Sequence, residues 1–164
     1  MFYTLAFQAV STAATKDTAK TVAAIIGANT DGVRARIRKI GVGFGDDTPH
    51  DRAYAITLKR VASNLAGNAG TAGSSVTAAN MPKHDSLSTD SLLTGGLNYS
   101  AEPTYESGQP LWALELYGKT SLLMEWDALD APIINKDQLI GLIVAPRSAD
   151  EADEVSGFIQ FEVF

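Results

Sequence analysis

Four ionisable residues, Asp46, Asp47, His50 and Asp51, lie close together between two apolar segments. Carboxylates beside an imidazole are groups that bind a divalent cation or exchange protons as general acid and base. The spacing does not match a calcium loop, because the alternating oxygen ligands and the closing bidentate glutamate are missing. We therefore interpret the stretch as a polar turn, in which aspartate side chains accept hydrogen bonds from nearby backbone N–H groups and Pro49 fixes a bend.

The second histidine, His84, is followed by Asp85 and several serines, so a Ser/His/Asp triad has to be considered. A catalytic base must reach its nucleophile across space, and the chain lacks the G-x-S-x-G turn that presents a nucleophilic serine. With two histidines and no cysteine, the chain also has few ligands for a metal-dependent enzyme of the cupin type. We expect no catalytic residue, no cofactor and no metal site, and we predict that the protein is not an enzyme.

An acidic cluster near the C-terminus contains Asp150, Glu151, Asp153 and Glu154. Carboxylates at this density could hold a cation, but like charges at the tip of a hairpin also deter aggregation through strand edges. We interpret the cluster as a solvated hairpin tip.

Three arginines, Arg34, Arg36 and Arg38, alternate with apolar residues and so share one face of a predicted strand. Guanidinium groups in a row can bind carboxylates of a partner in bidentate fashion. The alternative is an exposed face that keeps the protein soluble and forms weak ion pairs with local acids. Both interpretations stay open, and the three arginines are candidates for a partner interface.

An uncharged run extends from Val61 to Pro82, although one residue in five of the whole chain is charged. A segment rich in Gly, Ala, Ser and Asn has high backbone freedom, but without charge it can lie against another protein and leave no ion in a dry interface. We hypothesise that residues 63–80 pack against a neighbouring subunit or an underlying shell; the alternative is a surface loop without a partner. The candidate contact residues in this run are Asn64, Asn68, Thr71 and Ser74.

The aromatic residues Trp112, Tyr117 and Trp126 suggest a different function, because exposed rings can stack on sugars. In alternating strands, however, such residues are more often part of the core or of an interface. A carbohydrate-binding β-sandwich module is therefore the alternative to a structural binding protein.

Alternation of apolar and polar residues recurs along the chain and predicts strands. Tyr3, Leu5 and Phe7 share one face of an N-terminal strand, and a shift of the apolar phase after Lys39 predicts a bulge or bend in the strand 33–44. Residues 17–27 could form a helix, but their β-branched residues favour a strand. Further strands are predicted at 53–61, 111–118, 119–127, 138–146 and 156–164, with weaker ones near 75–79 and 96–100.

Eight to ten short strands separated by turn residues are typical of an antiparallel sandwich or barrel. A chain of 164 residues with 45% apolar residues suits one domain, residues 1–164, in which residues 1–17 form an N-terminal arm or an edge strand. The net charge of −6 opposes binding to nucleic acid. The apolar N-terminal stretch is too short to cross a bilayer and has no basic segment before it, so we expect no membrane association.

The order of segments resembles that of the small jelly-roll head decoration, or cement, proteins of tailed bacteriophages. The resemblance covers residues 18–164 and is loose from Tyr99 to Pro110. It rests on pattern and order rather than on a catalytic signature, in the segments "VRARIRKIGVGF", a short acidic loop, "AYAITLKRV", the uncharged run, "NMPKHD", "KDQLIGLIVAP" and "VSGFIQFEVF".

The resemblance implies an all-β, antiparallel, jelly-roll-like β-sandwich that binds the outside of a phage capsid and stabilises it. It implies two partners: the major capsid protein, and further copies of the chain in a homotrimer at capsomer junctions. The expected location is the outer surface of the virion, after synthesis in the host cytoplasm. The family has no catalytic residues to transfer to this chain.

Overall fold

The computed structural model describes residues 2–28, 31–45, 48, 51–61, 65–77, 93–148 and 152–164. Within these ranges the regular elements are eleven strands, and there is no helix. The model accordingly offers no helix among these residues with the length and apolarity to cross a membrane. The strands are β1 (Phe2–Ser11), β2 (Lys20–Ile26), β3 (Ala35–Phe44), β4 (Ala53–Arg60), β5 (Ser74–Thr77), β6 (Thr94–Leu97), β7 (Trp112–Tyr117), β8 (Ser121–Glu125), β9 (Ile133–Ile134), β10 (Leu139–Pro146) and β11 (Glu154–Val163).

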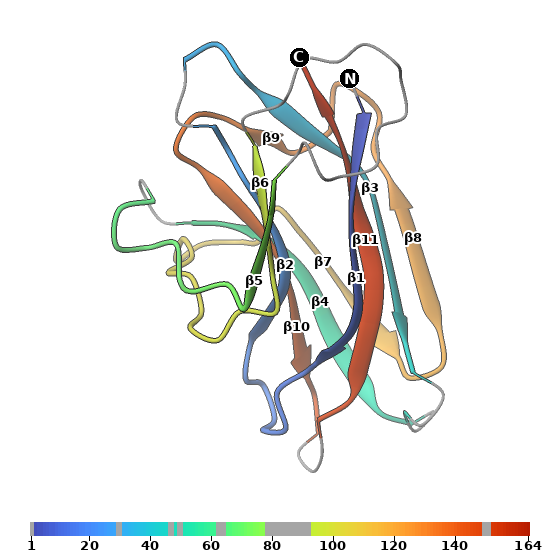
Figure 1. Cartoon of the computed structure of the whole chain (residues 1–164). Helices are drawn as coiled ribbons and strands as arrows, with labels where there is room; N and C mark the ends of the chain where they lie inside the picture. The colour runs from blue at the N-terminus through green and yellow to red at the C-terminus, as the bar shows by residue number, and fades with distance from the viewer. Residues whose placement is uncertain are drawn as a thin grey trace.

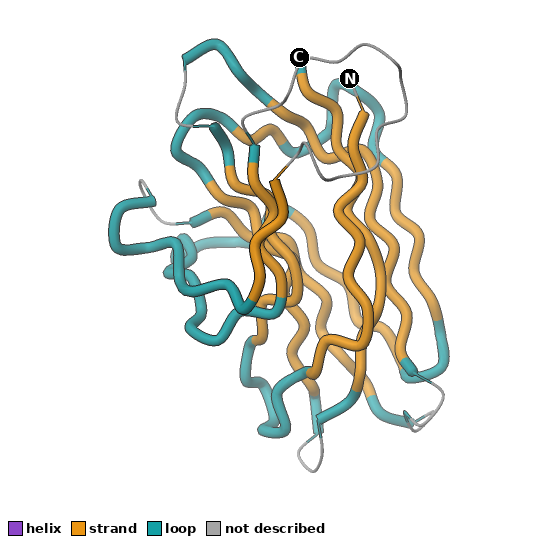
Figure 2. Tube along the Cα trace, viewed as in Figure 1, coloured by secondary structure: helices purple, strands orange, loops and turns teal. Residues whose placement is uncertain are grey.

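The strands form two antiparallel sheets that pack face to face (Figure 1). Sheet A has the order β1-β11-β3-β8, with β9 paired to one end of β3. Sheet B has the order β5-β6-β2-β10-β4-β7. Figure 2 shows that nearly all connections between strands lie at the two ends of the sandwich or outside sheet B.

The path of the chain through the two sheets is that of an eight-stranded jelly roll. Strands β1, β3, β8 and β11 belong to sheet A, and strands β2, β4, β7 and β10 belong to sheet B, so the chain crosses between sheets at most connections. This double-sheet arrangement is one way in which antiparallel proteins cover apolar sheet faces. The predicted all-β jelly-roll-like sandwich is confirmed, with eleven strands instead of eight to ten, because β5, β6 and β9 are additions to the eight.

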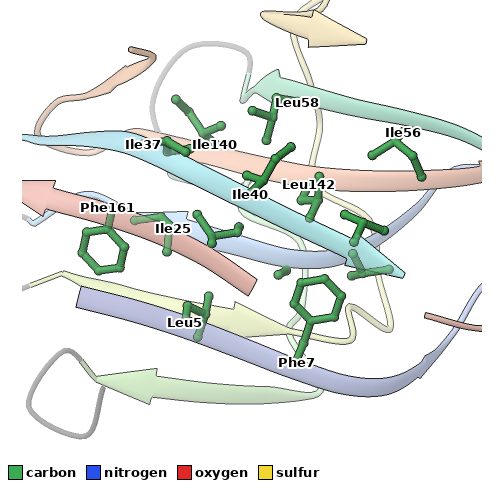
Figure 3. Packing of buried hydrophobic residues seen from close by; sticks show 14 of the residues in the cluster. Leu5, Phe7, Ile25, Ile37, Ile40, Ile56, Leu58, Ile140, Leu142 and Phe161 are labelled. Atoms are coloured by element: carbon green, nitrogen blue, oxygen red, sulfur yellow. The ribbon is translucent and has the colours of Figure 1, made fainter. Parts of the chain in front are cut away.

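The core lies between the sheets and follows the alternation in the sequence. Tyr3, Leu5 and Phe7 are buried, as predicted, and they meet Ile56 and Leu142 from the opposite sheet in one cluster (Figure 3). Complete burial of each such side chain contributes about 1.5–3 kcal/mol, which is the main driving force for closing the sandwich.

The shift of apolar phase in β3 corresponds to a bulge. Gln160 of β11 pairs with Lys39, but the next residue, Phe161, pairs with Ile37, so Arg38 is the extra residue. The bulge lets Ile37 and Ile40 both face the core, although they are three positions apart, an odd spacing that would place them on opposite faces of a regular strand. The predicted bulge is therefore confirmed.

Two further predictions concern ambiguous segments. Residues 20–26 form β2, so the strand interpretation is confirmed over the helix. The two weaker strands exist at shifted positions, since β5 begins at Ser74 and β6 ends at Leu97. Asn98 adopts a positive φ of 49°, which extended backbone does not allow, and this ends β6 earlier than predicted.

Residues between β4 and β7 cover the outer face of sheet B. Val61 and Tyr99 form a second buried cluster with Ala24 of β2 and Leu139 of β10. Tyr105 shares a hydrogen bond of 2.8 Å with the hydroxyl of buried Thr21. Figure 1 shows this insertion on the side of sheet B that faces away from sheet A.

Two tyrosines in this insertion differ in how their hydroxyls are satisfied. Burial raises the pKa of Tyr99 to about 12, and among the described residues its hydroxyl has no hydrogen-bond partner. We predict that Tyr99→Phe is neutral or stabilises the fold by up to about 1 kcal/mol, because it removes an unsatisfied buried group. Tyr105→Phe should cost about 0.5–1.5 kcal/mol, because it breaks the bond to Thr21. Urea unfolding of both variants measures these changes, and a larger loss for Tyr99→Phe would contradict the assignment.

Candidate docking surface

The outer face of sheet A carries a row of side chains across four strands. Phe2 of β1 pairs with Glu162 of β11, Glu162 pairs with Arg36 of β3, and Arg36 pairs with Ile133 of β9. Directly paired residues of neighbouring strands share one face of a sheet. The four side chains therefore belong to one continuous surface at the end of the sandwich where both chain termini lie (Figure 1).

Arg36 connects the parts of this surface. Its Nε donates a hydrogen bond of 2.8 Å to Glu162, and its Nη1 donates one of 3.3 Å to the carbonyl of Ala128. Its guanidinium carbon lies 4.7 Å from the ring centre of Phe164. The Phe164 backbone pairs in turn with Arg34, through hydrogen bonds of 3.0 and 3.3 Å. Arg36 is thus held in one orientation by the C-terminal segment and by the loop that contains Ala128.

Three exposed apolar residues belong to segments that contact Arg36 or pair with it. Leu129 is 97% exposed and follows Ala128, whose carbonyl accepts the hydrogen bond from Arg36. Phe164, which is 51% exposed, and Ile133, which is 38% exposed, complete the group. Single exposed apolar residues are ordinary, but aromatic and aliphatic side chains grouped around an arginine have the composition of interface centres. We call the group of Arg34, Arg36, Leu129, Ile133 and Phe164 the Arg36 patch.

Further charged side chains lie next to the Arg36 patch. Arg38 lies 3.5 Å from Glu162, and Lys39 lies 3.2 Å from Glu125. Arg38, Lys39 and Glu125 line a shallow hollow of 310 Å³ together with Phe2 and Gln160. The exposed residues Asp127 and Asp130 lie on either side of Leu129 in the sequence, so the basic side chains of this surface are balanced by acidic ones. Arg34 is the basic side chain of the patch that could bind a carboxylate of a partner, because it takes part in none of the ion pairs among the described residues.

Glu162 is the acidic centre of this surface. The hydrogen bond from Arg36 lowers the pKa of Glu162, and the positive charges of Arg36 and Arg38 lower it further. Glu162 therefore remains ionised at neutral pH, where it orients both guanidinium groups.

The predicted arginine row is present, and the structure supports parts of both interpretations. Arg34, Arg36 and Arg38 lie at the same end of sheet A, but Arg36 and Arg38 form ion pairs with the local acid Glu162. Arg34 is exposed and forms none of the ion pairs found among the described residues. Contact of any of the three with a partner stays a prediction.

The polar residues predicted for the same interface lie elsewhere. Asn68 and Thr71 lie in the segment that precedes β5, and Ser74 begins β5 at the edge of sheet B, so the structure does not bring them together with the arginines of sheet A. The Asn68 carbonyl accepts a hydrogen bond from the Thr104 N–H at 2.9 Å, and Thr71 pairs with Ala101. The described part of the uncharged run is thus paired within its own chain. Asn64 lies outside the described residues.

Several residues considered for catalysis or metal binding lie outside the described part of the chain: Asp46, Asp47, His50, His84, Asp85, Asp150 and Glu151. Near the first group, Asp51 is exposed, and the Thr48 N–H donates a hydrogen bond of 3.1 Å to Gly45 in a turn. In the residues that can be described, no three His, Cys, Asp or Glu side chains form a group that could hold a metal ion.

Asp153 differs from its prediction as part of a solvated hairpin tip. Its largely buried carboxylate forms an ion pair of 2.5 Å with Arg52 and accepts a hydrogen bond from the Tyr54 hydroxyl. Its backbone N–H donates to the Thr12 hydroxyl at 3.0 Å. Burial, followed by the bond to Asp153, raises the pKa of Tyr54. The prediction was wrong for Asp153, because a sequence pattern does not show that Arg52 and Tyr54 pack beside it.

The three aromatic residues proposed for sugar stacking do not form an exposed platform. Trp126 is buried, and Trp112 packs against the core, with an edge-to-face contact of 6.1 Å between the two ring centres. Tyr117 is exposed at the end of β7. Two of the three rings therefore stabilise the sandwich.

The apolar members of the Arg36 patch were not predicted as site residues. Leu129 lies in a loop without periodicity, and Ile133 belongs to a strand of two residues. Phe164 follows the last strand, where the alternation predicts only that it faces the same way as Glu162. That shared face was a signal in the sequence, but its position beside Arg36 depends on the pairing of β11 with β3.

The ion pair between Glu162 and Arg36 predicts a pH-dependent contribution to stability. Because the folded pKa of Glu162 lies below its ordinary value of 4.5, the contribution is present above that value and is lost as the pH falls through the folded pKa. We expect Glu162→Gln to lower the free energy of unfolding by about 0.5–1 kcal/mol at neutral pH. At about pH 3 the same substitution should leave the free energy of unfolding almost unchanged. Urea unfolding at both pH values measures the difference. Glu125→Gln is the control, with a smaller cost because Glu125 is more exposed; an equal cost for Glu162→Gln at both pH values would contradict the ion-pair origin.

The comparisons with known proteins do not assign the chain to a family. No family model matches it, and no curated protein matches it. Among solved structures, the chain is similar to one described as "Structure of infectious bursal disease virus Gt strain", with 12% identity and a TM-score of 0.15. That alignment covers 98% of this chain and 40% of the other, so the chain spans less than half the length of its match. A similarity at this level carries no argument about fold or function.

Proposed function

We propose that this protein is a structural binding protein that attaches to the outside of a bacteriophage capsid through the outer face of sheet A and stabilises the capsid. The observation that carries this proposal is the Arg36 patch. It combines exposed apolar side chains with arginines on a rigid sheet, and such residues dominate the free energy of protein interfaces. A rigid sheet also loses little conformational entropy on binding.

Arg34 specifies part of the chemistry of the partner. Its exposed guanidinium group suits a protein surface with exposed carboxylates, which it can bind in bidentate fashion. The apolar side chains of Leu129, Ile133 and Phe164 require an apolar contact area between those carboxylates. The major capsid protein is the partner that the resemblance to decoration proteins implies, and the location is then the outer surface of the virion.

Self-association contributes to this function through avidity. A capsid offers many identical sites, so a weak contact repeated within an oligomer binds tightly when all copies engage together. The homotrimer at capsomer junctions stays a prediction, because the contacts within one chain do not test it.

The test is binding of purified protein to emptied heads of the phage whose genome encodes the chain, prepared without this protein. We predict that the double variant Arg34→Glu, Leu129→Asp binds at least about tenfold more weakly, which corresponds to a loss of about 1.4 kcal/mol. Both side chains are exposed, so the variant should unfold at the same urea concentration as the parent. Cosedimentation with heads and electron microscopy of the pellets measure the binding.

Lys16→Glu is the matched control, because Lys16 is an exposed cation in the connection between β1 and β2, at the opposite end of the sandwich from the Arg36 patch (Figure 1). It changes the net charge as Arg34→Glu does and should leave binding nearly unchanged. Equal loss for the control and the double variant would show that net charge alone drives attachment. Failure of the parent protein to bind heads would refute the proposed function.

A further inference from the structure

Among the described residues, the edge strands of the two sheets differ in how well they are protected against pairing with another strand. On one side, β1 is interrupted by a bulge between Phe7 and Val10, where Ala9 has a positive φ of 50°, and β5 has four residues. On the other side, β7 and β8 pair with their neighbours in unbroken register. Neither β7 nor β8 contains proline or lysine. Bulges, short strands, proline and lysine are the features that prevent edge pairing, and the side of β7 and β8 lacks them.

The backbone groups at the free edge of β7 can be identified from its ladder. The Gly118 N–H donates a hydrogen bond of 2.8 Å to the Arg52 carbonyl, in the same register as the pair of Ala53 with Tyr117. In an antiparallel ladder, alternate residues bond to the same neighbour. The N–H and C=O groups of Ala113 and Glu115 therefore point away from β4 toward the free edge.

The same reasoning applies to β8. The Trp126 N–H donates a hydrogen bond of 2.9 Å to the Arg38 carbonyl, in register with the pair of Lys39 with Glu125. The backbone groups of Leu123 and Glu125 therefore point toward the free edge of sheet A. Leu123 is 66% exposed, so this edge also presents an apolar side chain.

The two free edges are aligned with each other across the sandwich. The rings of Trp112 and Trp126 are in contact, and each residue lies seven positions from Lys119 in the turn between β7 and β8. Two residues closer to this turn, the side chains that face the core are Leu114 in β7 and Met124 in β8. Leu114 pairs with the core residue Ile56, and Met124 pairs with the core residue Ile40. Leu114 is nevertheless 43% exposed, because none of the described strands lies on the far side of β7.

We propose that a second copy of this chain pairs with the β7–β8 side about one two-fold axis that passes beside Leu114 and Met124. In sheet B, Ala113 pairs with Glu115 of the partner subunit, and Leu114 lies opposite Leu114 of the partner subunit. In sheet A, Leu123 pairs with Glu125 of the partner subunit. Both ladders then use the backbone groups that point outward, and Leu114 becomes buried.

Charge disfavours the neighbouring register centred on Glu115. A two-fold axis at Glu115 would place two glutamates directly opposite each other, which is unfavourable. In the proposed register Glu115 faces alanine, and its carboxylate keeps its ion pair of 2.9 Å with Arg147. Glu125 likewise faces leucine and keeps its ion pair with Lys39.

A second copy also fits this side better than an extended peptide does. A peptide strand could pair with β7 or with β8, but the other edge strand would stay unpaired. The apolar side chains between the two edge strands, such as Leu114, would also stay exposed. A second copy presents both edge strands, and the distance between its β7 and β8 is the same as in the first copy because the two chains are identical. The contact is isologous and closes on itself, so it yields a dimer and not a filament. This dimer is an alternative to the homotrimer that the resemblance to decoration proteins implies, and the two assemblies exclude each other.

Cysteine cross-linking tests the register, because the native chain contains no cysteine. In the proposed dimer, Leu114 faces its counterpart as a non-hydrogen-bonded pair with Cα atoms about 4.5 Å apart, within the range of a disulfide. We expect Leu114→Cys to form a disulfide-linked dimer under mild oxidation. Tyr117→Cys is the matched control on the same exposed strand, where the two sulfurs would be about 20 Å apart and should not link.

Sedimentation velocity tests the association itself. The parent protein should sediment as a dimer at micromolar concentration, and Ala113→Pro should sediment as a monomer. This proline removes an N–H that points only to the free edge and leaves the ladder with β4 intact. Leu129→Asp, in the Arg36 patch, should leave the dimer unchanged. A monomeric or trimeric parent, or equal cross-linking of the Leu114→Cys and Tyr117→Cys variants, would overturn the proposal and leave capsid attachment untouched.

Discussion

The burial of two apolar sheet faces against each other is the interaction on which the whole molecule depends. Each sheet is apolar on its inner face, and neither is stable alone in water. Packing them together fixes what remains available for other molecules, namely two outer faces and four edges. The insertion between β4 and β7 covers much of the outer face of sheet B, with Tyr99 and Leu139 in a core of its own. Sheet A has no such cover among the described residues, and its outer face carries the Arg36 patch.

The strands themselves could be predicted from the sequence, because alternation is a local property. The phase shift after Lys39 predicted a bulge or bend in this strand, and the structure has the bulge at the neighbouring residue Arg38. The position of β6 was less accurate, because Thr94–Leu97 includes two glycines and ends at the positive φ of Asn98. Glycine has no side chain that would reveal a face, so periodicity could not fix the bounds of this strand.

The site was harder to predict, because it depends on which strands are neighbours. Arg36 was identified as a candidate, but Ile133 and Phe164 join it only through pairings across about 100 and 130 residues. Asp153 illustrates the same limit, since its burial depends on Tyr54 of β4, in the other sheet, and on Arg52, which directly precedes that strand. Long-range pairing decides whether a charged residue is solvated or buried, and the local sequence pattern does not predict which strands pair.

The two proposed contacts are compatible because of the direction of the two-fold axis. An axis through Leu114 and Met124 runs from one sheet to the other, roughly perpendicular to both. Rotation about such an axis leaves the outer face of sheet A on the same side of the dimer, so two copies of the Arg36 patch would face the same way. A dimer of this kind can lie flat on a shell and engage two sites together. Its affinity then exceeds that of one patch provided that the spacing of the patches matches the spacing of the sites. Edge pairing and surface attachment would thus reinforce each other without any shared residue.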